Sequence, residues 1–214
     1  MKLREFSNSG LVGYWKMDEG TGTTTYDRTD NNNDGAISGA SWAAGKVLGR
    51  CLDFDGTDDY VSLGTPTWFA GAGVQSVELW FNSDVSIGVD RVFSHPRTGT
   101  PGNRVYMTIG SDESLSFTLG TTLTTVRAAG AWNINQWYHF VIIRDADNTR
   151  GYSYLDGVLV NDVSVSLDTG LAAAAVTIGA TTSTSEFFDG TIDEVKVYNR
   201  RLSATEIARH YAAG

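Results

Sequence analysis

The stretch that decides the fold is FDGTIDEVKVYNRRLSATEI, residues 188–207, near the end of the chain. Its first half alternates apolar and polar residues, which is the period of a β-strand. Its second half begins a helix, because Ser203 is a good N-cap residue and Glu206 completes a capping box three positions later. Leu202 and Ile207 stand at the two positions of a hydrophobic staple. The stretch therefore predicts a long strand that leads into one short terminal helix.

Short apolar runs, separated by Gly, Asn and Asp, recur along the rest of the 214 residues. In VQSVELWFNS, Val77, Leu79 and Phe81 alternate with Glu78 and Trp80, so the first three share one face. QWYHFVIIRD is apolar on both faces, as in a strand covered on both sides. The pair Asp156-Gly157 is a strong hairpin signal. About ten such runs predict an all-β sandwich. We expect residues 1–9 to be an N-terminal extension and 10–214 to be a single domain.

Charge and composition exclude several classes of function. The net charge is −9, so no basic stripe exists to neutralise the phosphates of double-stranded nucleic acid. No apolar run approaches the roughly 18 residues of a membrane span, so no membrane insertion is expected. Cys51 is the single cysteine and cannot form an intrachain disulfide. The N-terminus lacks the apolar region of a classical signal peptide, which leaves a removed leader or assembly into a larger particle.

Seven landmarks in a fixed order point to a known family: GLVGYWKMDEGTG, YDRTDNNNDG, GRCLDFDGTDDYV, SVELWFN, NQWYHFVIIRD, GYSYLDGVLV and DGTIDEVKVYNRRLSATEI. With these landmarks the chain resembles the laminin-G-like domains of the concanavalin A-like lectin/glucanase superfamily, in the form found in bacterial, archaeal and phage proteins. The resemblance covers residues 10 to 211. It implies a jelly-roll sandwich of two curved antiparallel sheets.

The resemblance also implies a structural calcium at the edge of the sandwich. In many relatives the ion lies between an early Asp/Asn-rich loop, the FDG turn and the acid of the IDEV strand. Carried over to this chain, that nominates Asp193 as the anchoring carboxylate, with Asp27, Asn32, Gly35 and the carbonyl of Gly56 as partners. Hard cations of this kind take six to eight oxygen ligands.

Strand alternation gives a separate physical reason to single out Asp193. Counting by two from Val195 and Val197 places Asp193 on the core face, where a carboxylate must be paired, hydrogen-bonded or metal-bound. Glu194 then falls on the solvated face and needs no role. Two alternatives stay open: Asp193 is satisfied by backbone N–H groups or an arginine, and Asp27 is an ordinary turn residue.

No catalytic constellation emerges from the sequence. Glycosidases of this fold place acids at alternate positions of one strand, but here Trp80 and Asn82 follow Glu78. His139 lacks the Gln-x-His context of lyases, because Trp137 stands two positions before it, so we expect a histidine satisfied within the sheet. We therefore expect no enzymatic activity, with a glycoside hydrolase or polysaccharide lyase as the least favoured alternative.

One loop concentrates positive charge in this acidic chain, namely DRVFSHPRTGTPGNRVY. Its candidate ligand-binding residues, for an acidic sugar or a protein partner, are Arg91, His95, Arg97 and Arg104. The alternative is a solvated loop with no partner. Three tryptophans expected in or beside loops, Trp42, Trp68 and Trp132, are further candidates for stacking on sugars.

These observations predict a lectin-like binding module with a structural calcium, recognising a glycan or a surface protein outside the cell. The alternative is a virion or surface-assembly protein, such as a phage decoration or fibre component, with other virion proteins as partners.

Overall fold

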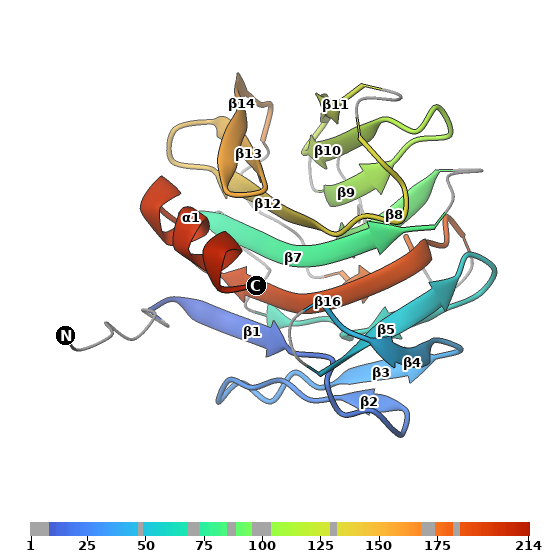
Figure 1. Cartoon of the computed structure of the whole chain (residues 1–214). Helices are drawn as coiled ribbons and strands as arrows, with labels where there is room; N and C mark the ends of the chain where they lie inside the picture. The colour runs from blue at the N-terminus through green and yellow to red at the C-terminus, as the bar shows by residue number, and fades with distance from the viewer. Residues whose placement is uncertain are drawn as a thin grey trace.

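The computed structural model describes residues 9–46, 49–67, 73–84, 89–95, 104–128, 132–167, 174–181 and 185–214. Within these residues the strands form two antiparallel sheets packed face to face, with one helix at the C-terminal end (Figure 1). The predicted all-β jelly-roll sandwich is confirmed.

Sheet A contains the long strands of the molecule. Its spatial order is β14 (Val158–Ser164), β13 (Arg150–Leu155), β12 (Tyr138–Asp145), β7 (Gln75–Ser83), β16 (Asp189–Tyr198), β5 (Arg50–Asp55) and β4 (Ser41–Ala44). β1 (Leu11–Trp15) also pairs with β16, along its second half, whereas β5 pairs along its first half. Strand β16 therefore carries the decisive stretch of sequence into the middle of the sheet.

Sheet B is built from shorter strands. Its order is β11 (Thr122–Arg127), β10 (Leu115–Leu119), β9 (Val105–Ile109), β8 (Asp90–His95), β15 (Thr177–Ile178), β6 (Tyr60–Ser62), β3 (Gly35–Ser38) and β2 (Thr24–Thr25). The chain passes from β7 of sheet A to β8 of sheet B, so Asp84 and Asp90 lie at the same end of the sandwich.

The main hydrophobic core fills the space between the sheets. Val77, Leu79 and Phe81 of β7 point into it, as the alternation predicts, and face residues such as Phe93 and Phe117 of sheet B. Strand β12 is buried along its whole length, in agreement with its two-sided apolar sequence. Burial of this apolar surface is the main favourable contribution to folding.

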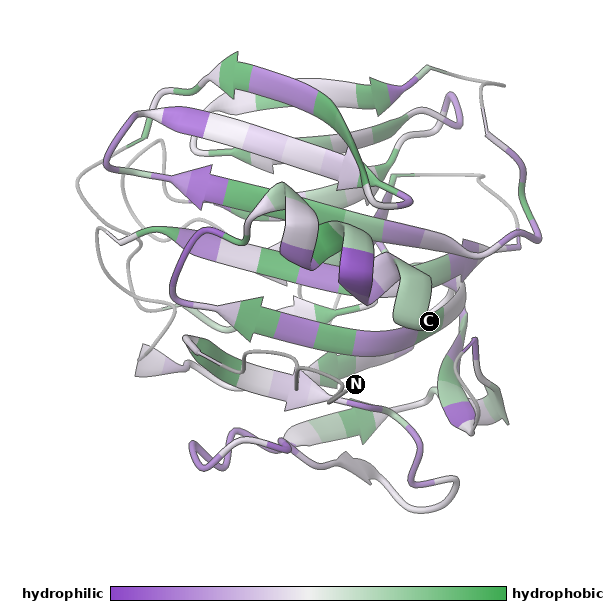
Figure 2. Ribbon diagram, turned by 60° about the vertical axis from the view of Figure 1, so that its left-hand side comes forward, coloured by the Kyte–Doolittle hydropathy of each residue, from purple (hydrophilic) through white to green (hydrophobic). Residues whose placement is uncertain are grey.

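Helix α1 (Ala204–Ala213) packs across the outer face of sheet A (Figure 2). Its predicted capping box is present, since Ser203 and Glu206 bond each other's backbone N–H groups. Leu202 and Ile207 are fully buried in a second apolar cluster with side chains of β12, β13 and β16, which include Val141, Ile143, Tyr152, Tyr154 and Tyr198. None of the helices in the described part of the chain is long and apolar enough to cross a membrane.

Candidate functional site

Two rows of hydroxyl-bearing side chains cross the outer face of sheet B. Strand register places them side by side. The first row contains Ser62, Thr177, Ser94, Tyr106 and Thr118, and the second contains Thr108, Ser116 and Thr125. We call these eight residues the hydroxyl face. Because neighbouring strands lie about 4.8 Å apart, each row is an evenly spaced array of donors and acceptors.

Arg91 lies at the edge of the hydroxyl face and is held there by several partners. Its guanidinium makes two contacts with the Glu186 carboxylate, at 3.1 and 3.2 Å, and donates to the hydroxyls of Thr181 and Thr108. It also stacks 4.4 Å from the ring centroid of Tyr106. Since Glu186 neutralises its charge, Arg91 is a fixed donor within a polar framework and not a free cation for an acidic sugar.

The two described members of the predicted basic cluster besides Arg91 are His95 and Arg104. His95 is buried at the end of β8. Arg104 donates its Nε–H to the carbonyl of Gly120 at 3.0 Å. Arg97 lies outside the described residues, as does Trp68. Trp132 is only 9% exposed in the main core, so its expected role in stacking on a ligand is wrong.

A β-bulge in β16 overturns the predicted face of Asp193. The register with β7 slips between Asp193 and Lys196, and Glu194 has φ +54°. The inserted residue lets Ile192, Val195 and Val197 all face the core, although strict alternation separates the first from the other two. Asp193 therefore lies on the outer face of sheet A, opposite Trp80, where its Oδ2 accepts a hydrogen bond from the N–H of Lys46 at 2.9 Å.

The bulge also changes the environment of Glu194, which the sequence assigned to solvent. Glu194 is only 7% exposed. It accepts a hydrogen bond from the Tyr14 hydroxyl at 2.7 Å and pairs with Lys196 at 3.2 Å. Burial and the Glu194 carboxylate together raise the pKa of Tyr14. The expectation of a solvated Glu194 is wrong.

Asp27 is the hub of the Asn/Asp-rich loop. Its two carboxylate oxygens accept five hydrogen bonds of 2.9 to 3.1 Å, from Tyr14 N, Thr29 N, Thr29 Oγ1, Asn33 N and Asn33 Nδ2. A carboxylate offers about four lone-pair positions, so these donors saturate it. This geometry fits the alternative of a turn-forming residue. Asn32 lies in the same loop with φ +53°, and Gly35 follows in β3.

The five residues predicted for calcium do not form a single coordination shell. Gly56 packs on Asp189, at the start of β16. Asp193 lies four residues further along that strand, about 13 Å away at 3.3 Å per residue. Calcium ligands must lie 2.3–2.6 Å from one ion, and Asp27 is already saturated. A calcium that used Gly56 would therefore need partners other than Asp193.

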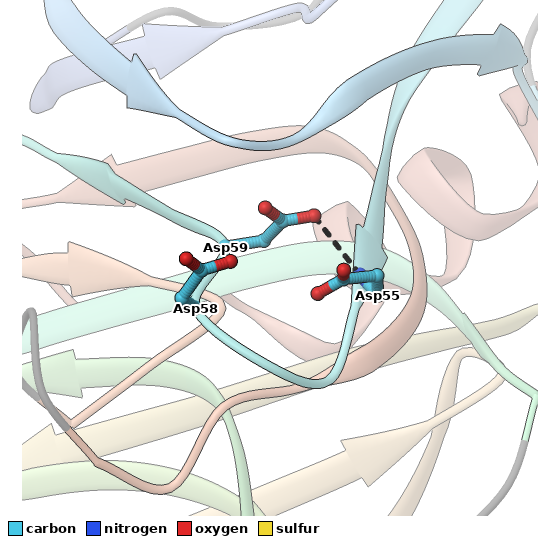
Figure 3. Close-up of side chains that lie close together, drawn as sticks. All are labelled: Asp55, Asp58 and Asp59. Atoms are coloured by element: carbon cyan, nitrogen blue, oxygen red, sulfur yellow. Dashed lines mark hydrogen bonds between the residues drawn. The ribbon is translucent and has the colours of Figure 1, made fainter.

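The structure gathers a different set of acids at the FDG turn. Figure 3 shows Asp55, Asp58 and Asp59, each with one carboxylate oxygen within 4.8 Å of the others. Asp59 accepts from the N–H of Asp55, and Asp55 accepts from the N–H of Thr57, so the turn is held in shape by its own backbone. All three acids stand in the sequence DFDGTDD, but Gly56 was the residue of this turn that was predicted to bind calcium.

A buried cluster of polar residues that the sequence did not predict lies between sheet A and helix α1. Glu78 is 1% exposed. Its carboxylate lies 2.8 Å from His210 Nδ1, 3.3 Å from the Tyr198 hydroxyl, 3.6 Å from Lys196 Nζ and 3.8 Å from His139 Nε2. We call these five residues the Glu78 cluster. They come from β7, β12, β16 and α1.

The pKa values of the Glu78 cluster reflect its burial. Burial alone would raise the pKa of Glu78, but the His210 hydrogen bond and the charge of Lys196 outweigh it and hold that pKa below its usual value. Burial lowers the pKa of His139 to about 4, so its ring is neutral near pH 7. The cluster is a compensated ion network, and His139 is a sheet histidine within it, as expected.

Comparison with known proteins supports the fold. A family model described as the concanavalin A-like lectin/glucanases superfamily matches residues 55–208. No curated protein sequence matches the chain. Domain 4 of AbnA, an extracellular arabinanase from Geobacillus stearothermophilus solved with arabinotriose, is 18% identical with a TM-score of 0.71. The match covers 94% of this chain and 98% of that domain.

Two further solved structures contain the same sandwich within longer chains. The binding domain of botulinum neurotoxin serotype D is 12% identical with a TM-score of 0.73, and the match covers 96% of this chain and 51% of that one. A Trypanosoma rangeli sialidase solved with the inhibitor DANA is 17% identical with a TM-score of 0.71, covering 96% and 33%. At these identities the likeness establishes the fold.

Proposed function

The chain belongs to the concanavalin A-like lectin/glucanase superfamily, and from this membership we propose that it is a non-catalytic binding module. Its ligand is a glycan or a surface protein, and the hydroxyl face favours a glycan. Solved relatives of the same fold include a toxin binding domain and a domain in complex with an oligosaccharide.

The observation that carries this proposal is the arrangement of the hydroxyl face. Within the described chain, the hydroxyls of Ser116 and Thr118 make no hydrogen bond to the protein, although Thr108 and Ser94 beside them do. Sugars are recognised by such hydroxyl groups together with an aromatic surface. Tyr106 is the aromatic residue of this face; it is 7% exposed, and Arg91 stacks on one side of its ring.

The same face argues for binding without catalysis. Retaining glycosidases need two carboxyl groups about 5 Å apart, and inverting ones need about 6.5–9.5 Å. On the described part of the hydroxyl face the neighbouring acid is Glu186, which is committed to Arg91 and Thr181. We therefore expect no hydrolysis of any glycan that binds, and we propose that the module works outside the cell or on a virion surface.

A glycan array, run with calcium and again with a chelator, tests the proposal. The probe is the double variant Ser116→Ala with Thr118→Val, which removes the two hydroxyls but keeps nearly the same volume. Each lost hydrogen bond costs about 1 kcal/mol, so we expect affinity to fall about tenfold or more. Thr21→Val, at an exposed position outside the face, is the matched control and should bind as the wild type does.

Each outcome decides between named alternatives. Binding that survives the double variant unchanged would place the glycan site elsewhere on the molecule. Failure of the wild type to bind any glycan in either condition would remove the glycan reading, and a surface protein or an assembly partner in a virion would become the better proposal. Product release from a bound oligosaccharide would contradict the non-catalytic assignment.

A further inference from the structure

Helix α1 is attached to sheet A by few apolar contacts. Ile207 is the one buried residue among the ten of the helix. Further contacts are aromatic or polar: Tyr211 stacks on Trp80 with ring centroids 5.6 Å apart, and His210 meets Glu78 at 2.8 Å. Isolated helices shorter than about 12–15 residues are marginal in water, so α1 stays helical only while it is docked.

His210 carries the polar link between the helix and the middle of the sheet. Its side chain is 9% exposed, and its ring stacks on Tyr198 with centroids 6.2 Å apart. Its partner Glu78 is fully covered by the sheet and the helix. Hydrogen bonds to an ionised group are stronger than neutral ones, and they gain strength where water is excluded. Docking of α1 therefore depends on Glu78 remaining an ionised partner for His210.

One carboxylate serves three basic side chains at this point. Glu78 is approached by Lys196 from β16 at 3.6 Å, by His139 from β12 at 3.8 Å and by His210 from α1. A second anion, Glu194, pairs with Lys196 at 3.2 Å. A proton on His139 therefore adds a positive charge to a site where Lys196 and His210 oppose it.

The other charged and titratable groups packed around this site have contacts of their own. Asp156, in the turn between β13 and β14, accepts the backbone N–H of His139 at 3.0 Å. Arg200 binds Glu206 of the helix at 2.7 Å. Among the described residues, Glu78 is the carboxylate within 4 Å of the His139 ring. The phenols that line the region are those of Tyr14, Tyr154, Tyr198 and Tyr211.

His139 is placed to sense whether the helix is docked. Its Nδ1 is buried and has no hydrogen-bond partner in the described part of the chain. The rings of Trp80 and Tyr211 pack beside it, with centroids 5.1 and 6.2 Å away. Since Tyr211 belongs to α1, departure of the helix removes one of these rings and admits water to the imidazole.

The titration of this site gives the direction of the pH effect. Burial lowers the pKa of His139 from 6.5 to about 4, so within this range the undocked state binds a proton that the docked state does not. Docking is therefore weakened as the pH falls from 6.5 towards 4. The lowered pKa of Glu78 acts in the same direction at still lower pH, because its carboxylate stabilises the docked state only while it is ionised.

We propose that α1 is an acid-released latch, which leaves sheet A as the pH falls from neutral to acidic while the sandwich stays folded. The main core lies on the opposite face of sheet A, where Val77 and Leu79 flank Glu78 in the sequence. At the other end of the sheet, Asp90 has a pKa raised to about 7, so its protonation stabilises the sandwich over the same pH range. Release uncovers the apolar face formed by Val141, Ile143, Tyr152, Tyr154 and Tyr198.

Amide hydrogen exchange of the full chain tests the latch without any glycan. It is followed residue by residue by NMR and corrected for the chemical exchange rate at each pH. Each pH unit below 6.5 should favour the undocked helix up to tenfold. We therefore expect the protection of residues 207–213 to fall about tenfold or more between pH 7 and pH 5. The amides of β9 and β10 should keep their protection.

Two variants separate the proton-binding group from the contact that holds the helix. His139→Leu removes the titrating ring but keeps an apolar side chain, so the protection of α1 should change less than about threefold between pH 7 and pH 5. His210→Ala removes the link to Glu78 and should lower that protection about tenfold or more at pH 7. Arg209→Ala, at an exposed position of the same helix, is the matched control and should behave as the wild type does.

Several results would overturn the latch. Wild-type protection of α1 that changes less than about threefold between pH 7 and pH 5 would show that docking is not coupled to a proton. Protection lost together in α1, β9 and β10 would show that acid unfolds the whole domain. Equal protection in His210→Ala and Arg209→Ala would show that the Glu78 contact does not hold the helix. These measurements decide the proposal even if His139→Leu does not fold.

Discussion

The Glu78 cluster and the aspartates around Asp189 both include residues at β7 and β16 of sheet A, but the negative charge is compensated in the first group and not in the second. Lys196 and Asp189 are seven residues apart on β16, about 23 Å at 3.3 Å per residue. Glu78 meets two histidines, a lysine and a tyrosine. Asp90 and Asp189 meet other aspartates.

The difference lies in which elements cover each end of the sheet. Helix α1 packs over the Glu78 end and delivers His210, so the network closes on every side. The other end is bounded by turns, whose acids add to the charge of the strands. Buried negative charge is therefore compensated at the first end and uncompensated at the second, and three variants test this contrast.

The largest effect is expected from Glu78→Gln. Breaking one partner of a buried ion network removes the carboxylate that Lys196 and His210 share, at a cost of about 3 kcal/mol. Because the pKa of Glu78 is lowered in the folded state, its contribution is fully present above its unfolded pKa and is lost as the pH falls. Urea unfolding of the variant and the wild type at pH 7 and pH 4 tests both the size of this loss and its dependence on pH. The control Asp147→Asn should change stability by less than about 0.5 kcal/mol.

A smaller effect of opposite sign is expected from Asp90→Asn. The pKa of Asp90 rises from 3.8 to about 7 on folding, so the folded state holds its proton more tightly, and stability falls as the pH rises between these values. In chelator at pH 8 the variant should be more stable than the wild type by on the order of 2 kcal/mol. At pH 4 the two should unfold alike. Equal stability of the two proteins at pH 8 would mean that the ionised Asp90 carboxylate does not destabilise the folded state.

The smallest effect is expected from Glu206→Gln, a compensated acid at the surface. Arg200 holds the Glu206 carboxylate at 2.7 and 3.0 Å and lowers its pKa to about 2, with help from Ser203. Solvent screens this pair and glutamine keeps the capping box, so the variant should cost about 0.5–1 kcal/mol, through the lost ion pair with Arg200. Thermal unfolding at low and high salt measures it. A loss of stability as large as that of Glu78→Gln would show that burial does not determine how much each of the two acids contributes to stability.

Local rules predicted the elements of the fold well. The capping box fixed the start of α1, and Asp156-Gly157 forms the tight turn between β13 and β14 with φ of +51° and +78°. The period of two correctly predicted the core face of β7. It failed in β16, because one inserted residue at Glu194 reverses the face of every position counted across it.

The candidate sites were less predictable for a related reason. The calcium set inferred from Asp193 and Asp27 assumed that loops distant in sequence converge, and the structure separates Asp193 from Gly56 along β16. Arg91 was predicted to bind a ligand as part of a basic cluster. Its pairing with Glu186, 95 residues away in the sequence, depends on a tertiary contact that the sequence pattern does not reveal.

The sequence alone determined what depends on neighbours along the chain: strand period, hairpin turn, helix cap and the family landmarks that assign the fold. Only the tertiary structure decided which charges meet. The register of β5, β16 and β7 brings Asp55, Asp189 and Asp84 into one row, and the docking of α1 places His210 on Glu78, 132 residues away. Electrostatic interactions depend on distance through space, and strand register and helix packing set that distance.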